Sequence, residues 1–187
     1  YGSANVDAIP AGNATLFLQR AKRKIRELAY NFDVDGYQAA DMTILNDTVT
    51  TSGINEMAYQ QSPDSILWCV RDDGVLAGLT YQRAEQVTAW HRHILGGAFG
   101  NGSAVVESVA SISGAINEDE LWVIVKRTIN GATKRYVECF ADFDFDETTS
   151  TDFRFLDSHL TYSGGATTTL SGLSHLEGQV VSILADG

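Results

Sequence analysis

A tryptophan-bearing apolar run occurs twice in this chain, and the repetition constrains the fold more than any other feature. Leu67-Trp68 in the first run is matched by Leu121-Trp122, 54 positions further on (121 − 67). Upstream of each run, Glu56-Met57-Ala58 is echoed by Glu107-Ser108-Val109-Ala110, with the glutamates 51 positions apart (107 − 56). Repeats of about 40 to 50 residues are typical of propeller blades and other stacked modules. We therefore expect a chain built from repeated units.

Turn dipeptides inside the repeats predict a hairpin in each unit. Asp73-Gly74 and Asn130-Gly131 each stand between two runs rich in β-branched and aromatic residues, which favour strands. The runs are 65–71 and 75–82 around the first dipeptide, and 120–128 and 132–140 around the second. Both dipeptides accept the positive φ angles of tight hairpin turns. The one helix-like stretch, Gln19 to Tyr30, also divides into two strands around a basic turn, and we prefer that division.

Each unit is expected to contain four short strands, namely an entering strand, a central hairpin and an outer strand. The first copy is fainter, with Leu16-Phe17-Leu18 and Ile25–Tyr30 as its hairpin, and Leu16 lies 51 positions before Leu67 (67 − 16). Outer strands are predicted at Val87–His91 and Met42–Val49. The predicted fold class is all-β, with consecutive antiparallel propeller-like blades that form a partial propeller. The repeated region covers residues 1–140, in units near 1–53, 54–104 and 105–140.

Residues 141–187 depart from this pattern. They begin with Asp142-Phe143-Asp144-Phe145-Asp146, continue through the Thr- and Gly-rich stretch Thr148–Gly172, and contain an expected strand at Val180–Leu184. We interpret them as a small acidic β element, or the start of an inserted domain, that follows the blades.

The charge distribution disfavours one class of partner. The net charge is −11, and residues 138–187 hold nine acidic side chains against Arg154 alone. An acidic surface repels phosphate, so sequence-independent gripping of nucleic acid is disfavoured. The exception is the basic run Lys22-Arg23-Lys24, flanked by Arg20 and Arg26. We interpret this run as a solvated hairpin tip rather than a nucleic-acid contact.

The cysteines indicate a reducing environment. Cys69 and Cys139 are the only two, and each lies inside an apolar run. A buried thiol behaves as a small apolar side chain, so we interpret both as reduced core residues without a disulfide framework.

Two sets of side chains have the spacing of metal ligands. His91 and His93 alternate on one predicted strand, and they share a face on which His159, His175 or a carboxylate would supply a third ligand. Asp142, Asp144 and Asp146 also share a face, and their oxygens suit calcium, but the run lacks the glycine and the distant glutamate of a calcium loop. Polar outer faces of strands produce the same alternation, and we favour that interpretation. No metal or cofactor is expected.

Catalysis is not indicated by any motif. The chain has no Gly-x-Ser-x-Gly elbow, no His-Glu-x-x-His and no phosphate-cradling loop.

Trp90 is the one tryptophan outside the repeated Leu-Trp pairs, and it is the candidate for stacking on a sugar ring. The pairs themselves, Leu67, Trp68, Leu121 and Trp122, are predicted to be buried at matching places in successive units.

Six segments resemble parts of tail proteins from tailed phages and prophages, and together they span nearly the whole chain. They are Arg23–Tyr30, Ser65–Tyr81, Val87–His93, Glu120–Arg127, Phe155–Ser158 and Gly172–Gly178. The resemblance is to the tail tubular, or nozzle, group of short-tailed phages, whose members surround the DNA exit channel with β-propellers.

The resemblance implies a structural, non-enzymatic part of a virion tail, made and assembled in the cytoplasm of the bacterial host. Its implied partners are other tail proteins and copies of the parent protein in a ring, with DNA passing nearby during ejection without sequence-specific contact. The family implies no catalytic residues. The alternatives are a host-glycan-binding receptor module of a phage tail, which would use Trp90, and a hydrolase hidden in the tail.

Overall fold

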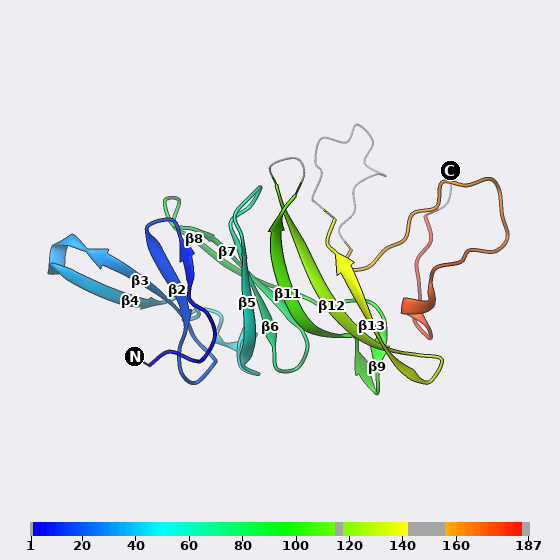
Figure 1. Cartoon of the computed structure of the whole chain (residues 1–187), viewed down its shortest axis with the longest axis horizontal. Coiled ribbons are helices and arrows are strands. Elements are labelled where there is room, and N and C mark those ends of the chain that lie inside the picture. The colour runs from blue at the N-terminus through cyan, green and yellow to red at the C-terminus, as the bar shows by residue number, and fades with distance from the viewer. Residues whose placement is uncertain (1, 115–117, 142–155, 185–187) are drawn as a thin grey trace.

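The computed structural model describes residues 2–114, 118–141 and 156–184. The strands in these ranges form antiparallel sheets and the helical segments are single 3-10 turns, so the predicted all-β class is confirmed. Figure 1 shows the three larger sheets one after another along the long axis of the molecule, like consecutive blades.

Each larger sheet is a meander in which sequence neighbours pair. The first contains β1 (Ile9–Ala11), β2 (Ala14–Leu18), β3 (Ile25–Asn31) and β4 (Gly36–Asp41). The second contains β5 (Ile54–Gln60), β6 (Ile66–Arg71), β7 (Leu76–Gln82) and β8 (Val87–His93). The third contains β11 (Val105–Ser113), β12 (Asp119–Ile129) and β13 (Ala132–Cys139). A small ribbon of β9 (Ala98–Phe99) and β10 (Gly102–Ser103) joins the second sheet to the third.

The hairpin turns lie where the sequence places them, although the two differ in type. Asn130 and Gly131 both have positive φ, +50° and +71°, as a two-residue primed turn requires. In the other turn only Gly74 has positive φ, +80°, and the Arg71 amide donates to the Val75 carbonyl at 3.1 Å. That turn is therefore a three-residue loop closed by a bulge. The stretch from Gln19 to Tyr30 contains the end of the β2–β3 hairpin and no helix.

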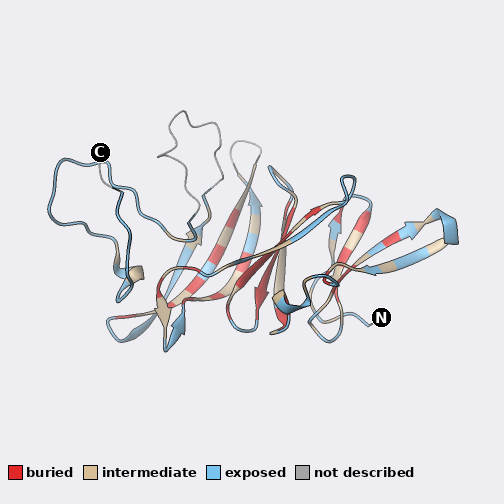
Figure 2. Ribbon diagram, turned by 180° about the vertical axis from the view of Figure 1, so that it is seen from behind, coloured by how far each residue is buried: buried red, intermediate tan, exposed pale blue. Residues whose placement is uncertain are grey.

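Strand alternation divides the buried side chains between two cores. In β6 all six residues are buried, because both faces of the second sheet are covered (Figure 2). Leu67 and Cys69 face the first sheet, where they meet Leu16 and Ile25. The opposite face of β6 presents Trp68 to the third sheet. There it joins a second cluster that also contains Val70, Leu121, Val123 and Val125.

Leu67 and Leu121 are equivalent, as the repeat predicts, but two other expected pairs, Leu16 with Leu67 and Glu56 with Glu107, do not occupy equivalent positions. Leu67 and Leu121 each face the preceding sheet and are 0% and 2% exposed. Leu16 packs in the same cluster as Leu67, so these two residues lie on facing sides of neighbouring sheets and are not equivalent. The glutamate echo is offset by one position: Glu56 corresponds in register to Ser108, whereas Glu107 falls at the bulge, which β5 and β11 carry at matching places.

Trp122 is not the buried core residue that the repeat predicts. Ala58 pairs with Trp68 and Ala110 pairs with Trp122, so the two tryptophans are equivalent in register. Trp68 is 4% exposed because the third sheet covers it. Trp122 faces away from the second sheet and is only half-buried. Cys139, its partner on β13, lies on the same outward face and is exposed, so the prediction of two buried cysteines is correct for Cys69 only.

The outer strand of the first sheet was misplaced by the sequence pattern. The strand is β4 at Gly36–Asp41, and the expected Met42–Val49 contains the 3-10 turn η2 (Asp47–Val49). The strand ends at Asp41. The Oδ1 atom of Asp41 accepts two hydrogen bonds from Thr43, one from the backbone amide at 2.9 Å and one from the side-chain hydroxyl at 2.5 Å. A side-chain acceptor of this kind favours a turn over further extension.

The strand expected at Val180–Leu184 does not form. These residues have no strand partner within the described ranges, and a strand needs a neighbour to satisfy its backbone. Within 156–184 the chain runs as a loop with one 3-10 turn, η4 (Ser174–Leu176). The acidic run that opens the expected small β element, Asp142 to Asp146, lies outside the described residues.

Candidate functional site

His91 and His93 come together with a third titratable side chain that the sequence pattern did not identify. His91 Nδ1 lies 2.8 Å from His93 Nε2, and His93 Nδ1 lies 2.5 Å from Asp157 Oδ1. Both histidines are on β8, whereas Asp157 comes from the loop that follows the third sheet. The three form a hydrogen-bonded chain, with His93 in the middle.

Aromatic rings enclose this chain of side chains. The Trp68 ring centroid lies 5.5 Å from that of His91 and 5.2 Å from that of His93, and Phe140 lies 5.7 Å from His93. The His91 ring rests on Gly78, where a Cβ atom would lie only 2.1 Å from His91 Cε1. Any side chain at position 78 would therefore clash with the His91 ring, and glycine leaves the space that the ring occupies.

The environment keeps His91 neutral. Burial, together with the nearby His93, lowers the pKa of the His91 imidazole to about 4, against the opposing effect of the Asp157 carboxylate. The contacts between the two imidazole rings and from His93 to Asp157 link β8 to the loop that carries Asp157. The arrangement is suited to holding the loop against β8.

The described contacts of this group join β8 to the loop after the third sheet. Within the described residues, no three His, Cys, Asp or Glu side chains gather closely enough to hold a metal ion. Of the other suggested ligands, His175 contacts the Gly172 carbonyl at 3.2 Å, and His159 is exposed. In the described part of the chain, neither His91 nor His93 has a hydrogen bond to a serine or threonine hydroxyl, which a hydrolytic nucleophile would need.

Further contacts hold the same loop to the sheets. The Gly96 amide donates to Ser158 Oγ at 2.9 Å, and the Asn130 amide donates to Glu177 Oε2 at 2.5 Å. Gly97 has φ +99°, and a Cβ there would lie 2.3 Å from the His175 carbonyl oxygen. The loop from Asp157 to Glu177 is thus bonded at three places, to His93 of β8, to Gly96 after β8 and to Asn130 in the β12–β13 turn.

Arg127, a buried arginine of β12, links β13 to the segment between β8 and β9. Arg127 is 0% exposed and donates through Nε to the Gly96 carbonyl at 2.8 Å. Its Nη1 and Nη2 form a two-pronged ion pair with Glu138, the second contact being 3.0 Å. No sequence signal marks this arginine, because its partners lie 31 and 11 residues away on other elements.

The remaining candidate residues are occupied within the fold. Trp90 packs against the core between the first two sheets, and its indole N–H donates to the Met42 carbonyl at 2.8 Å. Trp90 is thus half-buried, with its indole N–H bonded within the fold, and its proposed role in glycan binding stays a prediction. The basic run is a hairpin tip, as predicted, with Lys24 paired to Asp41 at 2.5 Å and Lys22 bonded to Asn55 at 2.9 Å.

No protein-family model matches this chain, and no curated protein is significantly similar to it. None of the helical segments in the described ranges has the length and apolar character needed to cross a membrane.

Proposed function

We propose that this chain is a structural part of a tailed-phage virion tail, in the nozzle or tail tubular protein that surrounds the DNA exit channel. It acts by shape and assembly, without catalysis. Its partners are other tail proteins and further copies of the parent protein. The sequence resemblance supplies the family, and the stacking of the sheets supports the mechanical role.

The observation that carries this proposal is the continuous face-to-face stacking of the three sheets. One apolar core joins the first sheet to the second, and another joins the second to the third. Glu56 of β5 strengthens the second junction by accepting from Ser108 Oγ at 2.9 Å and the Val109 amide at 3.4 Å. Because close-packed cores resist deformation, such a stack makes a stiff wall segment.

The charge balance fits a surface that DNA passes without adhering. Several basic groups are already paired, including Lys126 and Arg135, which both contact Glu107 at 2.9 and 2.6 Å. Paired cations release few counterions from DNA, so they add little to its binding. With a net charge of −11, the surface favours sliding over gripping.

Immunogold electron microscopy of particles that carry the chain tests this proposal. Gold from an antibody raised against the chain should gather at the tail close to the exit channel. Label confined to fibre tips, or absent from purified particles while present in lysates, would contradict it. A mobility-shift assay with double-stranded DNA at about 0.15 M salt should show no retardation below micromolar protein.

A further inference from the structure

A surface hollow on the β3–β4 hairpin is used by none of the contacts described above. This hairpin projects beyond the body of the molecule (Figure 1), and the hollow occupies about 330 Å³ on one of its faces. That volume is at the small end of the range for ligand pockets. The lining residues are Glu27, Ala29, Tyr30, Asn31, Phe32, Asp33, Gln38, Ala40 and Arg83.

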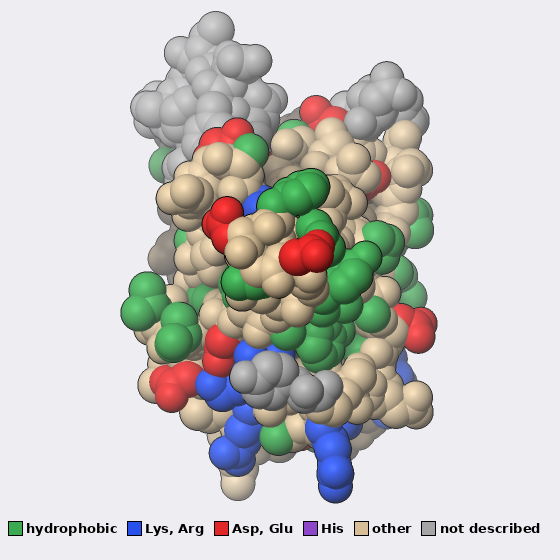
Figure 3. Space-filling view, turned by 90° about the vertical axis from the view of Figure 1, so that its left-hand side faces the viewer, with side chains coloured by type: hydrophobic (Ala, Val, Ile, Leu, Met, Phe, Trp, Pro, Cys, Tyr) green, Lys and Arg blue, Asp and Glu red, His purple; other side chains and the backbone are tan. Residues whose placement is uncertain are grey.

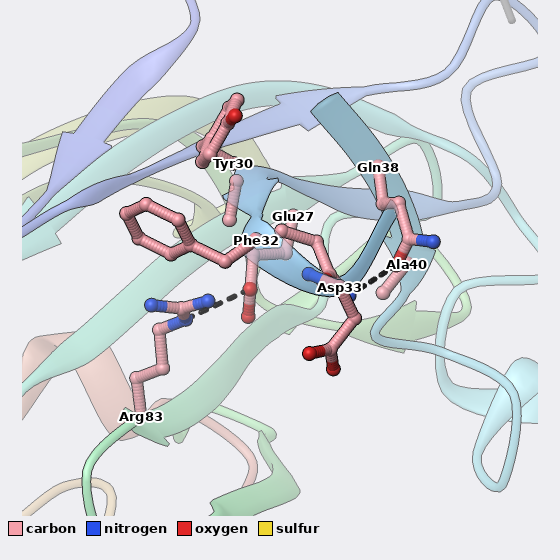
Figure 4. Close-up of a pocket in the computed structure, with 9 residues that line it drawn as sticks. Glu27, Tyr30, Phe32, Asp33, Gln38, Ala40 and Arg83 are labelled. Atoms are coloured by element: carbon pink, nitrogen blue, oxygen red, sulfur yellow. Dashed lines mark hydrogen bonds and ion pairs between the residues drawn. The ribbon is translucent and has the colours of Figure 1, made fainter. Parts of the chain in front are cut away.

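Strand register explains why a hollow forms here. Glu27 pairs with Ala40 and Ala29 pairs with Gln38, so these four side chains lie on one face of the hairpin. Two of them are alanines, and their small side chains leave space between the larger neighbours. Phe32 and Asp33 of the turn η1 (Phe32–Val34) and Arg83, from the turn after β7, complete the lining (Figure 4).

The polar groups of the hollow are held in fixed positions. Glu27 Oε1 accepts from Arg83 Nε at 2.9 Å, and Glu27 Oε2 accepts from the Tyr81 hydroxyl at 2.8 Å. Arg83 is held a second time, because its Nη1 donates to Asn13 Oδ1 at 2.9 Å. The pair therefore joins the first two sheets, and it presents a carboxylate and a guanidinium whose orientations are already set.

Two amide side chains define the opposite wall. Asn31 Nδ2 donates to Gln38 Oε1 at 3.1 Å, and Asn31 Oδ1 accepts from the Asp33 amide at 2.8 Å. These bonds orient the Gln38 amide, and none of those between described residues uses its nitrogen, which faces the ligand as a donor.

An exposed aromatic ring stands beside these groups. Phe32 is 88% exposed, and its ring is held edge-on against Tyr30, with centroids 5.0 Å apart and an interplanar angle of 84°. Figure 4 shows the Phe32 ring and the Arg83 side chain on the same side of the hollow, and Gln38 on the other. Figure 3, which views this end of the molecule, shows apolar side chains gathered with carboxylates beside them.

We propose that this hollow binds a neutral saccharide, with one sugar ring stacked on Phe32. An aromatic face packs against the C–H groups of a sugar, and the fixed carboxylate, amide and guanidinium groups pair with its hydroxyls. Anionic sugars are excluded, because Glu27 already neutralises Arg83 and Asp33 adds a second carboxylate at the rim. This activity goes beyond the mechanical role, and either proposal stands if the other fails.

Saturation-transfer difference NMR on the full chain tests the proposal. The probes are glucose, galactose, rhamnose, N-acetylglucosamine and their disaccharides, with sialic acid and glucose 6-phosphate as anionic comparisons. We expect transfer from at least one neutral probe at about 10 mM, a concentration that detects millimolar Kd values. Phe32→Ala and Gln38→Ala should each weaken that binding by about tenfold or more.

The matched control is Leu45→Ala, which removes a side chain that is 90% exposed and lies outside the lining of the hollow. It should leave binding unchanged. Because Phe32 is so exposed, Phe32→Ala should keep the thermal midpoint of the parent, which separates lost binding from lost folding. Three results would overturn the proposal: no transfer from any neutral probe, anionic probes that bind as tightly, or a Phe32→Ala variant that binds as the parent does.

Discussion

Replacement of Trp68 by alanine should destabilise the chain far more than the same change at Trp122. The two tryptophans occupy equivalent register positions opposite Ala58 and Ala110, but only Trp68 is covered by another sheet. The comparison therefore isolates the effect of stacking from the effect of residue type.

The expected magnitude follows from the surroundings of Trp68. A tryptophan buries about 150–250 Å², which corresponds to about 4–6 kcal/mol at about 25 cal/mol per Å². Alanine retains part of this burial, and the site relaxes partly, so the expected loss is about 3–5 kcal/mol. It includes about 1 kcal/mol for the bond from Trp68 Nε1 to Gln60 Oε1, 3.0 Å long, whose acceptor is in a buried residue.

Trp122→Ala should cost only about 1 kcal/mol. Its ring is half-buried on the outward face of the third sheet, and its indole N–H donates to Glu120 at 2.9 Å. Urea unfolding followed by far-ultraviolet circular dichroism measures both free energies of unfolding, and Trp68→Phe separates the lost hydrogen bond from the lost packing. Equal losses for the two alanine variants, or a loss below about 1 kcal/mol at Trp68, would refute the stacking argument.

Three further predictions concern the charged and titratable groups. Arg127→Ala should lower the free energy of unfolding by about 3–5 kcal/mol, because it leaves the Glu138 carboxylate and the Gly96 carbonyl without their buried partner. Lys134→Ala, an exposed change on the next strand, should lower it by less than about 0.5 kcal/mol, and equal effects in thermal unfolding would contradict this prediction. The pKa of His91 is lowered from about 6.5 to about 4 in the folded chain, so its stabilising contribution is complete above pH 6.5 and is lost as the pH falls toward 4. His91→Gln should therefore reduce the dependence of the urea midpoint on pH between those two values. An unchanged pH dependence would count against the assignment. Zinc, calcium or a chelator should leave the thermal midpoint unchanged. A metal bound by the folded chain at a hundredfold excess over its Kd would instead add about 2.7 kcal/mol to the free energy of unfolding. A rise of several degrees that His93→Ala abolishes would refute the purely structural account of the histidines.

The local features of the fold could be predicted from the sequence. Asn130-Gly131 and Asp73-Gly74 specify turns through residues that tolerate positive φ, and the apolar runs beside them specify strands. The order of the sheets also follows, because antiparallel meanders pair neighbours along the chain. These features depend only on residues close in sequence.

The facing of individual side chains could not be predicted in the same way. One inserted residue reverses the side of a strand to which every later side chain points, and the bulges in β5 and β11 are not visible in the pattern of apolar residues. Trp122 was expected to be buried because its residue type repeats that of Trp68. Its exposure depends instead on whether another sheet covers that face.

The contacts of the candidate sites lie further beyond the reach of sequence patterns. Asp157 meets His93 from 64 positions away, and Arg83 meets Glu27 from 56 positions away. Such pairs are set by how the sheets and loops pack, so spacing suggested His91 and His93 as a pair but gave no third partner. The hollow beside Phe32 likewise depends on the register that places Ala29 and Ala40 on one face of the hairpin.

A high-resolution electron density map of an intact particle carrying this chain tests the central claim most directly. The account predicts three stacked antiparallel sheets in the wall around the DNA exit channel, with Trp68 enclosed between the second and third sheets. Density for this chain at a site remote from the channel, or sheets that do not stack at Trp68, would contradict it.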